Sequence, residues 1–401
     1  MAHILFLNEF FHPDICASAV VATDHLTRLA EMEPAWKITV LAGNRAWNDP
    51  ARIYPPEETY AGLKIIRVNR PAVRRSLLGR GIGFAILHRN VLRAAKALGP
   101  VDLVIGTTAP PQGGILAAKI ARAKKCPFIY KVLDLYPDVA VTLARLRERS
   151  FIHRRWLRWD TLAMQNAAAV VTISTPISDR IARLRNINPK KLYTIHDGYD
   201  PARIAPPQQN RFRQQHVPEG KFVVQYAGNM GLSHPFETIL ASAKLLADSQ
   251  PDILFQFIGD GPNRSQLESG ATKNMSRIPF QPAEKLGEVL ATADVGLICQ
   301  EEKMFDQALP YKIYALLAAG KPCIFIGSDQ SEIARWLLTA GAGRVISQGD
   351  ANGLAGAIVD LRQSKQRDVM AQAARQLFEA RFNSIRAAES WRDLIAETLK
   401  S

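Results

Sequence analysis

The stretch "PYKIYALLAAGKPCIF" at residues 310–325 has the pattern of a short helix that runs directly into a strand. Pro310 suits the first helical position, where its missing N–H is not needed, and Gly320 suits the position just after a helix. A strand-like run, "ADVGLICQ", precedes this stretch at residues 293–300. A strand, a helix and a second strand in this order are typical of a parallel α/β sheet.

The same alternation extends along most of the 401-residue chain. Between the two halves, "YDPARIAPPQQNRF" fits neither pattern and is typical of a linker. Helical spacing separates most of the β-rich runs, which favours parallel, doubly wound sheets. The runs are "HILFLN", "KITVLAG", "LKIIRVN", "DLVIGTT", "PFIYKVLDLYP", "AVVTIST" and "KLYTIHDG" in the first half, and "KFVVQYAG", "ILFQFIGDG", "SRIPFQP", "ADVGLICQ", "PCIFIG" and "AGRVIS" in the second.

These runs predict an α/β protein with two doubly wound parallel-sheet (Rossmann-like) domains that face a cleft. A chain of this length exceeds the size at which one hydrophobic core usually stays whole. We place the first domain at residues 1–203 and the second at 204–375, and the last segment, 376–401, has helical spacing throughout. Ligands of such sheets bind beyond the carboxyl ends of the strands, so the strand-to-helix loops are the expected functional positions.

The formal charge of +14 belongs to the first half. Residues 1–205 contain 30 Lys and Arg against 16 Asp and Glu, whereas the rest of the chain contains 21 of each. Two stretches, 74–98 and 143–159, combine basic with apolar residues, as in helices that bind an anionic membrane surface. A charged outer helix face is the plainer alternative, and nucleic acid is not expected because no binding module is recognised. The residues predicted for the membrane-facing surface are Arg74, Arg75, Arg80, Arg154, Arg155, Trp156 and Trp159.

The cysteines and the amino terminus indicate the compartment. Cys16, Cys126, Cys299 and Cys323 lie far apart without a Cys-x-x-Cys pair, which is typical of thiols in a reducing compartment. The first residues, "MAHILFLNEFFHPD", lack the features of a signal peptide, and no run approaches the roughly 18 apolar residues of a membrane-spanning helix. We expect a cytoplasmic protein associated with the inner face of the cytoplasmic membrane.

Three loops in the second half have the composition of phosphate-binding loops. "YAGNMGLS" (226–233) and "FIGDGPNRSQLE" (257–268) each follow a strand, and their glycines allow a backbone to approach a ligand closely. Lys312 falls in the first turn of a predicted helix, where a cation is unfavourable unless an anion joins it. Taken singly, each glycine loop is explained by a tight turn, and Lys312 is explained by a side chain that extends into solvent. Together they predict one phosphate-bearing ligand.

Eight motifs, in the same order, resemble the retaining glycosyltransferases of family 4, which have the GT-B fold. The resemblance is to bacterial members that build exopolysaccharide, capsule or lipopolysaccharide. It implies a nucleotide-sugar donor in the second domain, an acceptor in the first, retention of anomeric configuration, and a terminal helix around Trp391 that crosses back onto the first domain. The motifs are "NEFFHPDICASA", "VLDLYPDVA", "AAAVVTISTPISDRI", "IHDGYDPARI", "VQYAGNMGL", "FIGDGP", "FQPAEKLGEVLATADVGL" and "LPYKIYALLAAGKPCI".

The resemblance also implies that no metal is required, and the sequence has no Asp-x-Asp in a plausible loop. We expect no cofactor besides the nucleotide-diphosphate sugar, which is a co-substrate. Because the predicted acceptor domain is basic, a polyprenyl-diphosphate-linked acceptor at an anionic membrane is the favoured partner, with a polysaccharide acceptor as the other possibility.

The chain departs from the family pattern at two acidic positions. Members typically carry two glutamates eight residues apart, one near the sugar and one at the ribose, and the matching residues here are Gln307 and Ala315. The Arg and Lys that many members have in the first loop of the second domain are also missing, since "GNMGLSHP" offers only Asn229 and His234. Nucleotide recognition therefore has to come from other residues.

The predicted donor site combines the glycine loops with the residues around Lys312. The leaving diphosphate gains negative charge as the sugar bond breaks, so Lys312 and the main-chain amides of the loops are expected to stabilise it. Glu301 and Asp306 are nearby acids that could replace the family glutamates. The site comprises Gly228, Asn229, Gly231, Gly259, Gly261, Glu302, Gln307, Pro310, Tyr311 and Lys312.

In the first domain, Asp134 and His12 are the candidates for positioning or activating the acceptor hydroxyl. Asp134 follows a strand and matches the acidic position of the family, whereas a lone loop histidine is more often structural. Glu9 lies similarly at a strand end, and Asp138 is equally explained as a helix cap. The predicted catalytic residues are therefore Asp134, His12 and Lys312.

Two other functions stay open on the sequence. Without the family glutamates, the chain could be a non-catalytic homologue that acts as a scaffold or regulatory subunit. A sugar-nucleotide epimerase has the same architecture. Hydrolysis of a donor separates the enzyme from the scaffold, and isomerised donor in the absence of acceptor indicates an epimerase.

Overall fold

The stretch at residues 310–325 forms the helix and strand that its pattern predicts. In the computed structural model, which describes residues 1–71, 77–204 and 209–400, helix α11 (Lys312–Ala318) connects the parallel neighbours β12 (Val295–Cys299) and β13 (Cys323–Ile326). Gly320 ends the helix with a φ of +61°, a conformation that glycine adopts without strain. Pro310 does not occupy the first helical position as predicted, because the helix begins only at Lys312.

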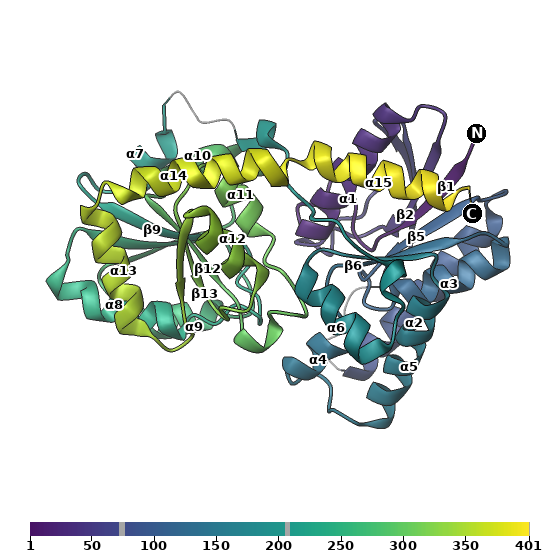
Figure 1. Ribbon diagram of the computed structural model, residues 1–401, viewed down its shortest axis with the longest axis horizontal. Helices are drawn as coiled ribbons and strands as arrows, with labels where there is room; N and C mark the ends of the chain where they lie inside the picture. The colour runs from purple at the N-terminus through teal and green to yellow at the C-terminus, as the bar shows by residue number, and fades with distance from the viewer. Residues whose placement is uncertain (72–76, 205–208, 401) are drawn as a thin grey trace. The chain divides into compact units, whose positions relative to one another are not determined.

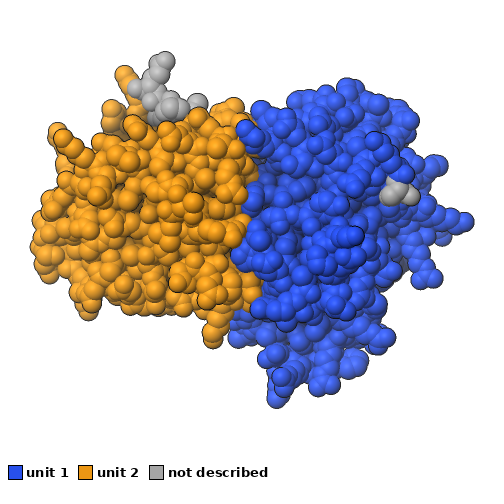
Figure 2. All heavy atoms as spheres, in the orientation of Figure 1, with its two compact units in different colours: residues 1–197, 384–401 blue, residues 198–383 orange. Residues whose placement is uncertain are grey.

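The chain divides into two units (Figure 2). The first unit contains Met1–Asp197 and Ser384–Ser401, and the second contains Gly198–Asn383. The first unit thus ends shortly before residue 203, and the terminal segment joins it from Ser384 rather than from residue 376. Burial explains this position, because Phe378 and Phe382 belong to a core cluster of the second unit whereas Trp391 belongs to the core of the first.

The first unit contains an eight-stranded sheet in the order β3-β4-β2-β1-β5-β6-β7-β8. All neighbours pair parallel except β3 and β4. The parallel strands are mostly buried, as expected of a sheet covered on both faces. The strands are β1 (His3–Leu7), β2 (Lys37–Gly43), β3 (Glu57–Tyr60), β4 (Leu63–Val68), β5 (Leu103–Thr107), β6 (Phe128–Val132), β7 (Ala169–Thr172) and β8 (Leu192–Thr194).

Helices cover both faces of this sheet (Figure 1). Helices α1 and α15 pack together over one face, and α2, α3 and α5 lie over the other. Trp391 of α15 is buried in the same cluster as Phe6 and Leu26, which shows how the terminal helix joins this unit. The helices are α1 (Ala17–Met32), α2 (Leu77–Ala97), α3 (Gly113–Lys124), α4 (Asp138–Thr142), α5 (Phe151–Asn166), α6 (Thr175–Arg185) and α15 (Ser384–Thr398).

The second unit contains a six-stranded parallel sheet in the order β11-β10-β9-β12-β13-β14. Its other strands are β9 (Phe222–Ala227), β10 (Ile253–Ile258), β11 (Met275–Ile278) and β14 (Gly343–Ile346). Its other helices are α7 (Arg211–His216), α8 (Glu237–Ser249), α9 (Arg264–Ser269), α10 (Leu286–Thr292), α12 (Glu332–Ala340), α13 (Ala351–Gln363) and α14 (Gln366–Leu377). The prediction of two doubly wound parallel-sheet domains is confirmed.

Candidate functional site

Lys312, the first residue of α11, directs its ammonium group at the ring of Tyr226. Nζ lies 3.2 Å from the ring centroid, and it has no hydrogen-bond partner among the residues that the structure describes. The residue is half-buried, but Nζ itself is inaccessible, and this burial lowers the pKa of Lys312 to about 7. A buried ammonium without hydrogen bonds is costly unless an anion pairs with it, so Lys312 is the strongest candidate for binding an anionic ligand.

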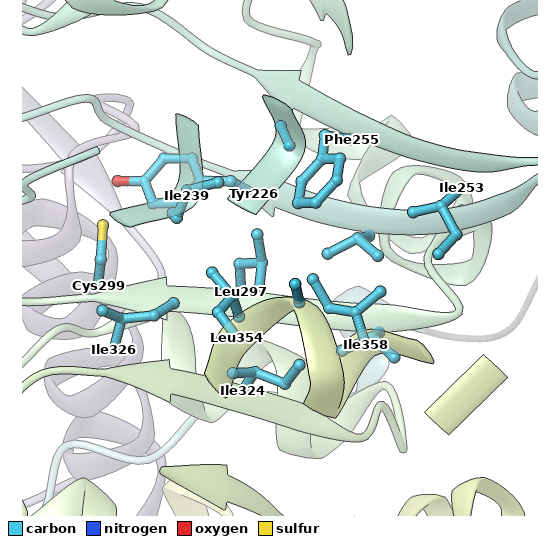
Figure 3. Close-up of a cluster of buried hydrophobic side chains, with 14 of the residues drawn as sticks. Tyr226, Ile239, Ile253, Phe255, Leu297, Cys299, Ile324, Ile326, Leu354 and Ile358 are labelled. Atoms are coloured by element: carbon cyan, nitrogen blue, oxygen red, sulfur yellow. The ribbon is translucent and has the colours of Figure 1, made fainter. Parts of the chain in front are cut away.

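The carboxyl edge of the second sheet positions this lysine. Tyr226 lies near the end of β9 and Cys299 ends β12, and the two strands are neighbours. Figure 3 shows Tyr226 and Cys299 at one end of the buried cluster and Ile253 at the other. This edge is where open parallel sheets bind ligands.

The loop after β9 holds the Tyr226 ring in place. The Tyr226 hydroxyl donates to the main-chain carbonyl of Asn229 at 2.7 Å and lies 3.1 Å from Nδ1 of His234. Burial, together with the nearby Lys312 charge, lowers the pKa of His234 to about 3. His234 is therefore neutral at pH 7 and supplies no replacement for the cationic residues that many family members have in this loop.

The loop glycines serve contacts between two loops. Gly228 and Gly259 continue the sheet through amides that donate to the carbonyls of Ile258 and Ile278 at 2.9 and 3.0 Å. A Cβ on Gly259 would overlap the carbonyl oxygen of Gly228, and one on Gly261 would come within 2.5 Å of that of Met230. The expectation that main-chain amides of the loops stabilise the diphosphate does not hold for Gly228, whose amide is bonded within the sheet, and α8 begins only at Glu237.

Gly228 is the residue of that loop that lies against the lysine. A Cβ placed on Gly228 would meet only Lys312, at 3.7 Å from both Cε and Nζ. The amide of Gly231 is 3.3 Å from Nδ1 of His234. Gly228 therefore lies directly beside the ammonium group, in a position where a side chain would contact it.

The loop between β12 and α11 is held by its own polar side chains. The buried Gln307 amide donates to the carbonyl of Lys303 at 2.7 Å, and the Glu302 carboxylate accepts from the amide of Gln348 at 2.9 Å. Asp306 is buried as well, and Ala315 lies in an apolar cluster. These contacts give Gln307 and Glu302 structural roles, and their predicted contacts with a donor stay predictions.

In the first unit, Asp134 lies just beyond β6 with a free carboxylate. Its amide donates to Oγ1 of Thr108, beyond the neighbouring strand β5, at 3.2 Å. Its carboxylate has no hydrogen bond or ion pair within the described part of the chain, and burial raises the pKa of Asp134 to about 6. The charges of Asp134 and Glu9 both add to the effect of burial in raising the pKa of Tyr136, so these three groups lie near one another.

The other predicted residues of the first unit have partners. Glu9 forms an ion pair with Arg70 at 2.5 Å. The ring of His12 stacks on that of Tyr60, with centroids 3.6 Å apart, which places His12 at the β3–β4 edge of the sheet. Asp138 is the first residue of α4 rather than its cap, and it binds the guanidinium groups of Arg180 and Arg185 from α6.

Helix α5 exposes both basic and apolar side chains. Arg154 and Arg155 are exposed, Trp156 is half-buried, and Trp159 is 43% exposed beneath the Arg155 guanidinium, which lies 4.4 Å from its ring centroid. Phe151, at the start of the helix, is 75% exposed. Arg74 and Arg75, and the side chain of Arg80, lie outside the described residues.

Neither a metal site nor a membrane span is found in the described residues. No three His, Cys, Asp or Glu side chains there come together as metal ligands. No helix in residues 1–71, 77–204 and 209–400 has the length and hydropathy needed to cross a bilayer.

Two family models match the chain, one over most of the first unit and one within the second. Residues 19–203 match the model of Glycosyltransferase Family 4, and residues 221–364 match that of Glycosyl transferases group 1. The chain belongs to glycosyltransferase family 4. The resemblance inferred from the eight motifs is thereby confirmed.

Relatives of this family 4 glycosyltransferase include two bacterial sugar-transfer proteins. It is 26% identical to the probable glycosyltransferase WbjE of Pseudomonas aeruginosa over 281 residues, which are 67% of this chain and 68% of WbjE. It is 27% identical over 126 residues, or 30% of each chain, to WcaI of Escherichia coli K12, assigned as a colanic acid biosynthesis glycosyl transferase.

Solved structures show the fold of this family 4 glycosyltransferase. HepE of Anabaena in complex with UDP-glucose superposes with a TM-score of 0.72 at 15% identity, over 99% of this chain and 100% of HepE. Such a likeness at low identity shows a shared GT-B fold.

The sequence named the glycine loop after β9 and the start of α11, but it missed that the Tyr226 ring lies against Lys312. Tyr226 belongs both to the predicted strand "KFVVQYAG" and to the predicted loop 226–233, with no role of its own. An aromatic residue directly before the Ala-Gly turn of a strand-to-helix loop was the available signal.

Proposed function

We propose that this glycosyltransferase moves a sugar from a nucleotide-diphosphate donor to a lipid-linked or polysaccharide acceptor, with retention of configuration, in cell-surface polysaccharide synthesis. The observation that carries the donor assignment is the Lys312 ammonium, which is buried beside Gly228 without a hydrogen-bond partner among the described residues. The UDP-glucose bound by HepE and the colanic acid assignment of WcaI support the donor class and the pathway class.

A thermal-shift panel of sugar nucleotides tests the donor assignment. A ligand at 100 times its Kd stabilises a protein by about 2.7 kcal/mol, so a binding donor raises the melting temperature measurably. We expect one nucleotide-diphosphate sugar to do so and to be hydrolysed slowly without acceptor. Failure of every uridine, guanosine and adenosine donor would refute the donor assignment. Proton NMR of the anomeric signal in the product tests retention.

We further propose that Asp134 positions or activates the acceptor hydroxyl. Asp134→Asn is expected to lower turnover about 10²-fold or more, the usual contribution of a general acid or base. Steady-state rates measure this, with Asp179→Asn, which removes an exposed carboxylate of the same unit, as the control. Unchanged turnover in Asp134→Asn would exclude the role.

The same variant has a pH-dependent effect on stability. Burial raises the pKa of Asp134 to about 6 in the folded chain, whereas an unfolded aspartate titrates near ~3.9. Ionisation of Asp134 therefore opposes folding, and this penalty develops as the pH rises from about 4 to about 6. Asp134→Asn should unfold at a higher temperature than the wild type at pH 7, and at the same temperature below pH 4.

We propose that the exposed face of α5 binds an anionic membrane surface. Each basic residue near such a surface contributes about 1 kcal/mol, so Arg154→Glu combined with Arg155→Glu should weaken binding to phosphatidylserine vesicles about 30-fold or more. Sedimentation with vesicles measures this. The control, Arg211→Glu with Lys244→Glu, changes the net charge equally at exposed positions of the second unit. Equal losses in both variants would mean that binding is not localised to α5.

A non-catalytic scaffold is the second candidate. It is favoured by the two positions that match the family glutamates, because the Gln307 amide serves the loop itself and Ala315 lies in an apolar cluster. A scaffold would bind a donor without hydrolysing or transferring it, so the hydrolysis assay above separates the two candidates. Isomerised donor without acceptor would instead indicate an epimerase.

A further inference from the structure

Tyr226 is the residue against which the Lys312 ammonium lies, and the proposed function gives it no task. We propose that Tyr226 is a positioning residue, whose ring face holds the charged ammonium of Lys312 where the diphosphate of the donor binds. The contact between the Lys312 ammonium and the Tyr226 ring does not depend on what the protein does, but the role that we give to this contact in donor binding rests on the proposed function.

The geometry is that of a strong cation–π contact. Nζ of Lys312 lies 3.2 Å from the Tyr226 centroid, well inside the roughly 6 Å within which an ammonium is attracted to a ring face. No hydrogen-bond acceptor among the described residues meets this nitrogen. The ring is therefore the main group that compensates the ammonium for lost hydration.

The other titratable groups around Lys312 do not provide a counter-charge. Burial raises the pKa of the Cys299 thiol, at the end of β12, to about 12. Burial lowers the pKa of the His234 imidazole to about 3. Both groups are thus uncharged at pH 7, which leaves the aromatic face as the stabilising contact for the cation.

The Tyr226 ring is fixed by contacts of its own. The Tyr226 hydroxyl donates to the Asn229 carbonyl at 2.7 Å, and its ring packs edge-on against Phe236 with centroids 4.9 Å apart. Tyr226 is completely buried. Because the hydroxyl is bonded to the loop that carries Gly228, the ring fixes the place of the ammonium relative to that loop.

Simple core packing is the alternative explanation of Tyr226, and it predicts a different dependence on the ring. Packing depends on the shape of the side chain, whereas a cation–π contact depends on the negative charge of the ring face. Fluorination withdraws that charge with little change of shape. We therefore compare phenylalanine with a trifluorinated phenylalanine at position 226, so that both proteins lack the hydroxyl and differ only in the charge of the ring face.

The pKa of Lys312 is the first readout, measured by carbon-13 NMR of protein labelled at the lysine ε-carbons, with Lys312→Met identifying the signal. Tyr226→Phe should keep the wild-type pKa, and the trifluorinated ring should lower it by about one unit. The same fluorinated residue at Phe257, a buried aromatic of β10 whose centroid lies 6.4 Å from that of Tyr226, should leave the Lys312 pKa unchanged. Equal pKa values for the two rings at position 226 would overturn the proposal.

Binding of UDP, GDP and ADP at pH 8.5 is the second readout. Above the pKa of Lys312, binding an anion requires the lysine to take up a proton, so a pKa lowered by one unit should weaken the nucleotide about tenfold. A lowered pKa with unchanged affinity would show that the ring does not act in the bound state, which overturns positioning. If the wild type binds none of the three nucleotides, the proposed function fails, while the NMR readout still decides whether the ring holds the ammonium.

Discussion

Lys312→Met should lower turnover by about 10²–10³-fold and leave the stability unchanged or higher. Removing one fixed donor from the site where negative charge develops typically costs this much in rate. The free energy of unfolding should not fall, because Nζ has no hydrogen bond to lose within the described residues. Burial also lowers the pKa of Lys312 to about 7, which means that the charged ammonium opposes folding. Methionine keeps the length of the side chain and its contact with the Tyr226 ring. Steady-state kinetics and thermal unfolding measure the two effects.

Lys321 provides the matched control, since it is a second half-buried lysine of the same unit, but one whose ammonium has hydrogen-bond acceptors. Its Nζ donates to the carbonyls of Ala291 and Ala293 at 3.0 and 2.7 Å. Lys321→Met should therefore destabilise the protein by about 1–3 kcal/mol, the cost of unsatisfied buried acceptors, with little loss of turnover per folded molecule. Equal activity of wild type and Lys312→Met would exclude Lys312 from leaving-group stabilisation.

The pH dependence of donor binding follows from the same group. Since the pKa of Lys312 in the ligand-free protein is about 7, the lysine is increasingly neutral above that pH and must be protonated when an anion binds. Donor affinity should therefore fall towards tenfold per pH unit above pH 7, until the raised pKa of the complex is reached. Lys312→Met should bind the donor weakly, and its affinity should not fall with pH in this way, because the variant lacks the group that takes up the proton.

The sequence predicted the parallel strands because they are buried and apolar, but it missed β3 (Glu57–Tyr60). That strand is an exposed edge strand of "EETY", paired antiparallel with β4, and neither its composition nor its length separates it from a loop. Its position matters for the site, because Tyr60 stacks on His12. A residue proposed for catalysis thus lies against an element that the sequence did not indicate.

Position within one helix could be predicted, whereas partners from distant segments could not. The helical pattern placed Lys312 in the first turn of α11, which the structure confirms. That its ammonium would lie over Tyr226 depends on β9 and β12 being neighbours in the sheet, which the order of the strands along the chain does not reveal. The ion pair of Glu9 with Arg70 likewise joins segments that follow different strands.

The loop glycines were interpreted correctly as positions of close approach, but their partner is another loop. Gly259 and Gly261 follow β10 and contact the carbonyls of Gly228 and Met230, which follow the neighbouring β9. A strand-to-helix glycine has the same sequence pattern whether a phosphate or a second backbone lies against it. The arrangement still serves the site, because the loop held in this way carries Gly228 beside Lys312.

Gly259→Ala should destabilise the second unit by about 3 kcal/mol or more and abolish donor binding. Gly259 has a φ of +129°, a region that costs a residue with a side chain about 1–3 kcal/mol. Its new Cβ would also overlap the carbonyl oxygen of Gly228, and overpacking of this kind costs a further 1–3 kcal/mol or so. Relief of the overlap requires the loop after β9 to shift at Gly228, the residue beside Lys312. Denaturant unfolding and nucleotide titration measure the two losses.

Gly220→Ala separates backbone strain from the loop contact. Gly220 also has a positive φ, +76°, but an added Cβ there would meet nothing within 4 Å. Its substitution should therefore cost only the strain of a left-handed conformation, about 1–2 kcal/mol, and leave nucleotide binding intact. If Gly259→Ala were as mild as Gly220→Ala and still bound nucleotide, the two loops would not depend on each other. Loss of binding in Gly259→Ala alone would show that contact between the loops sets the position of Gly228 beside the Lys312 ammonium.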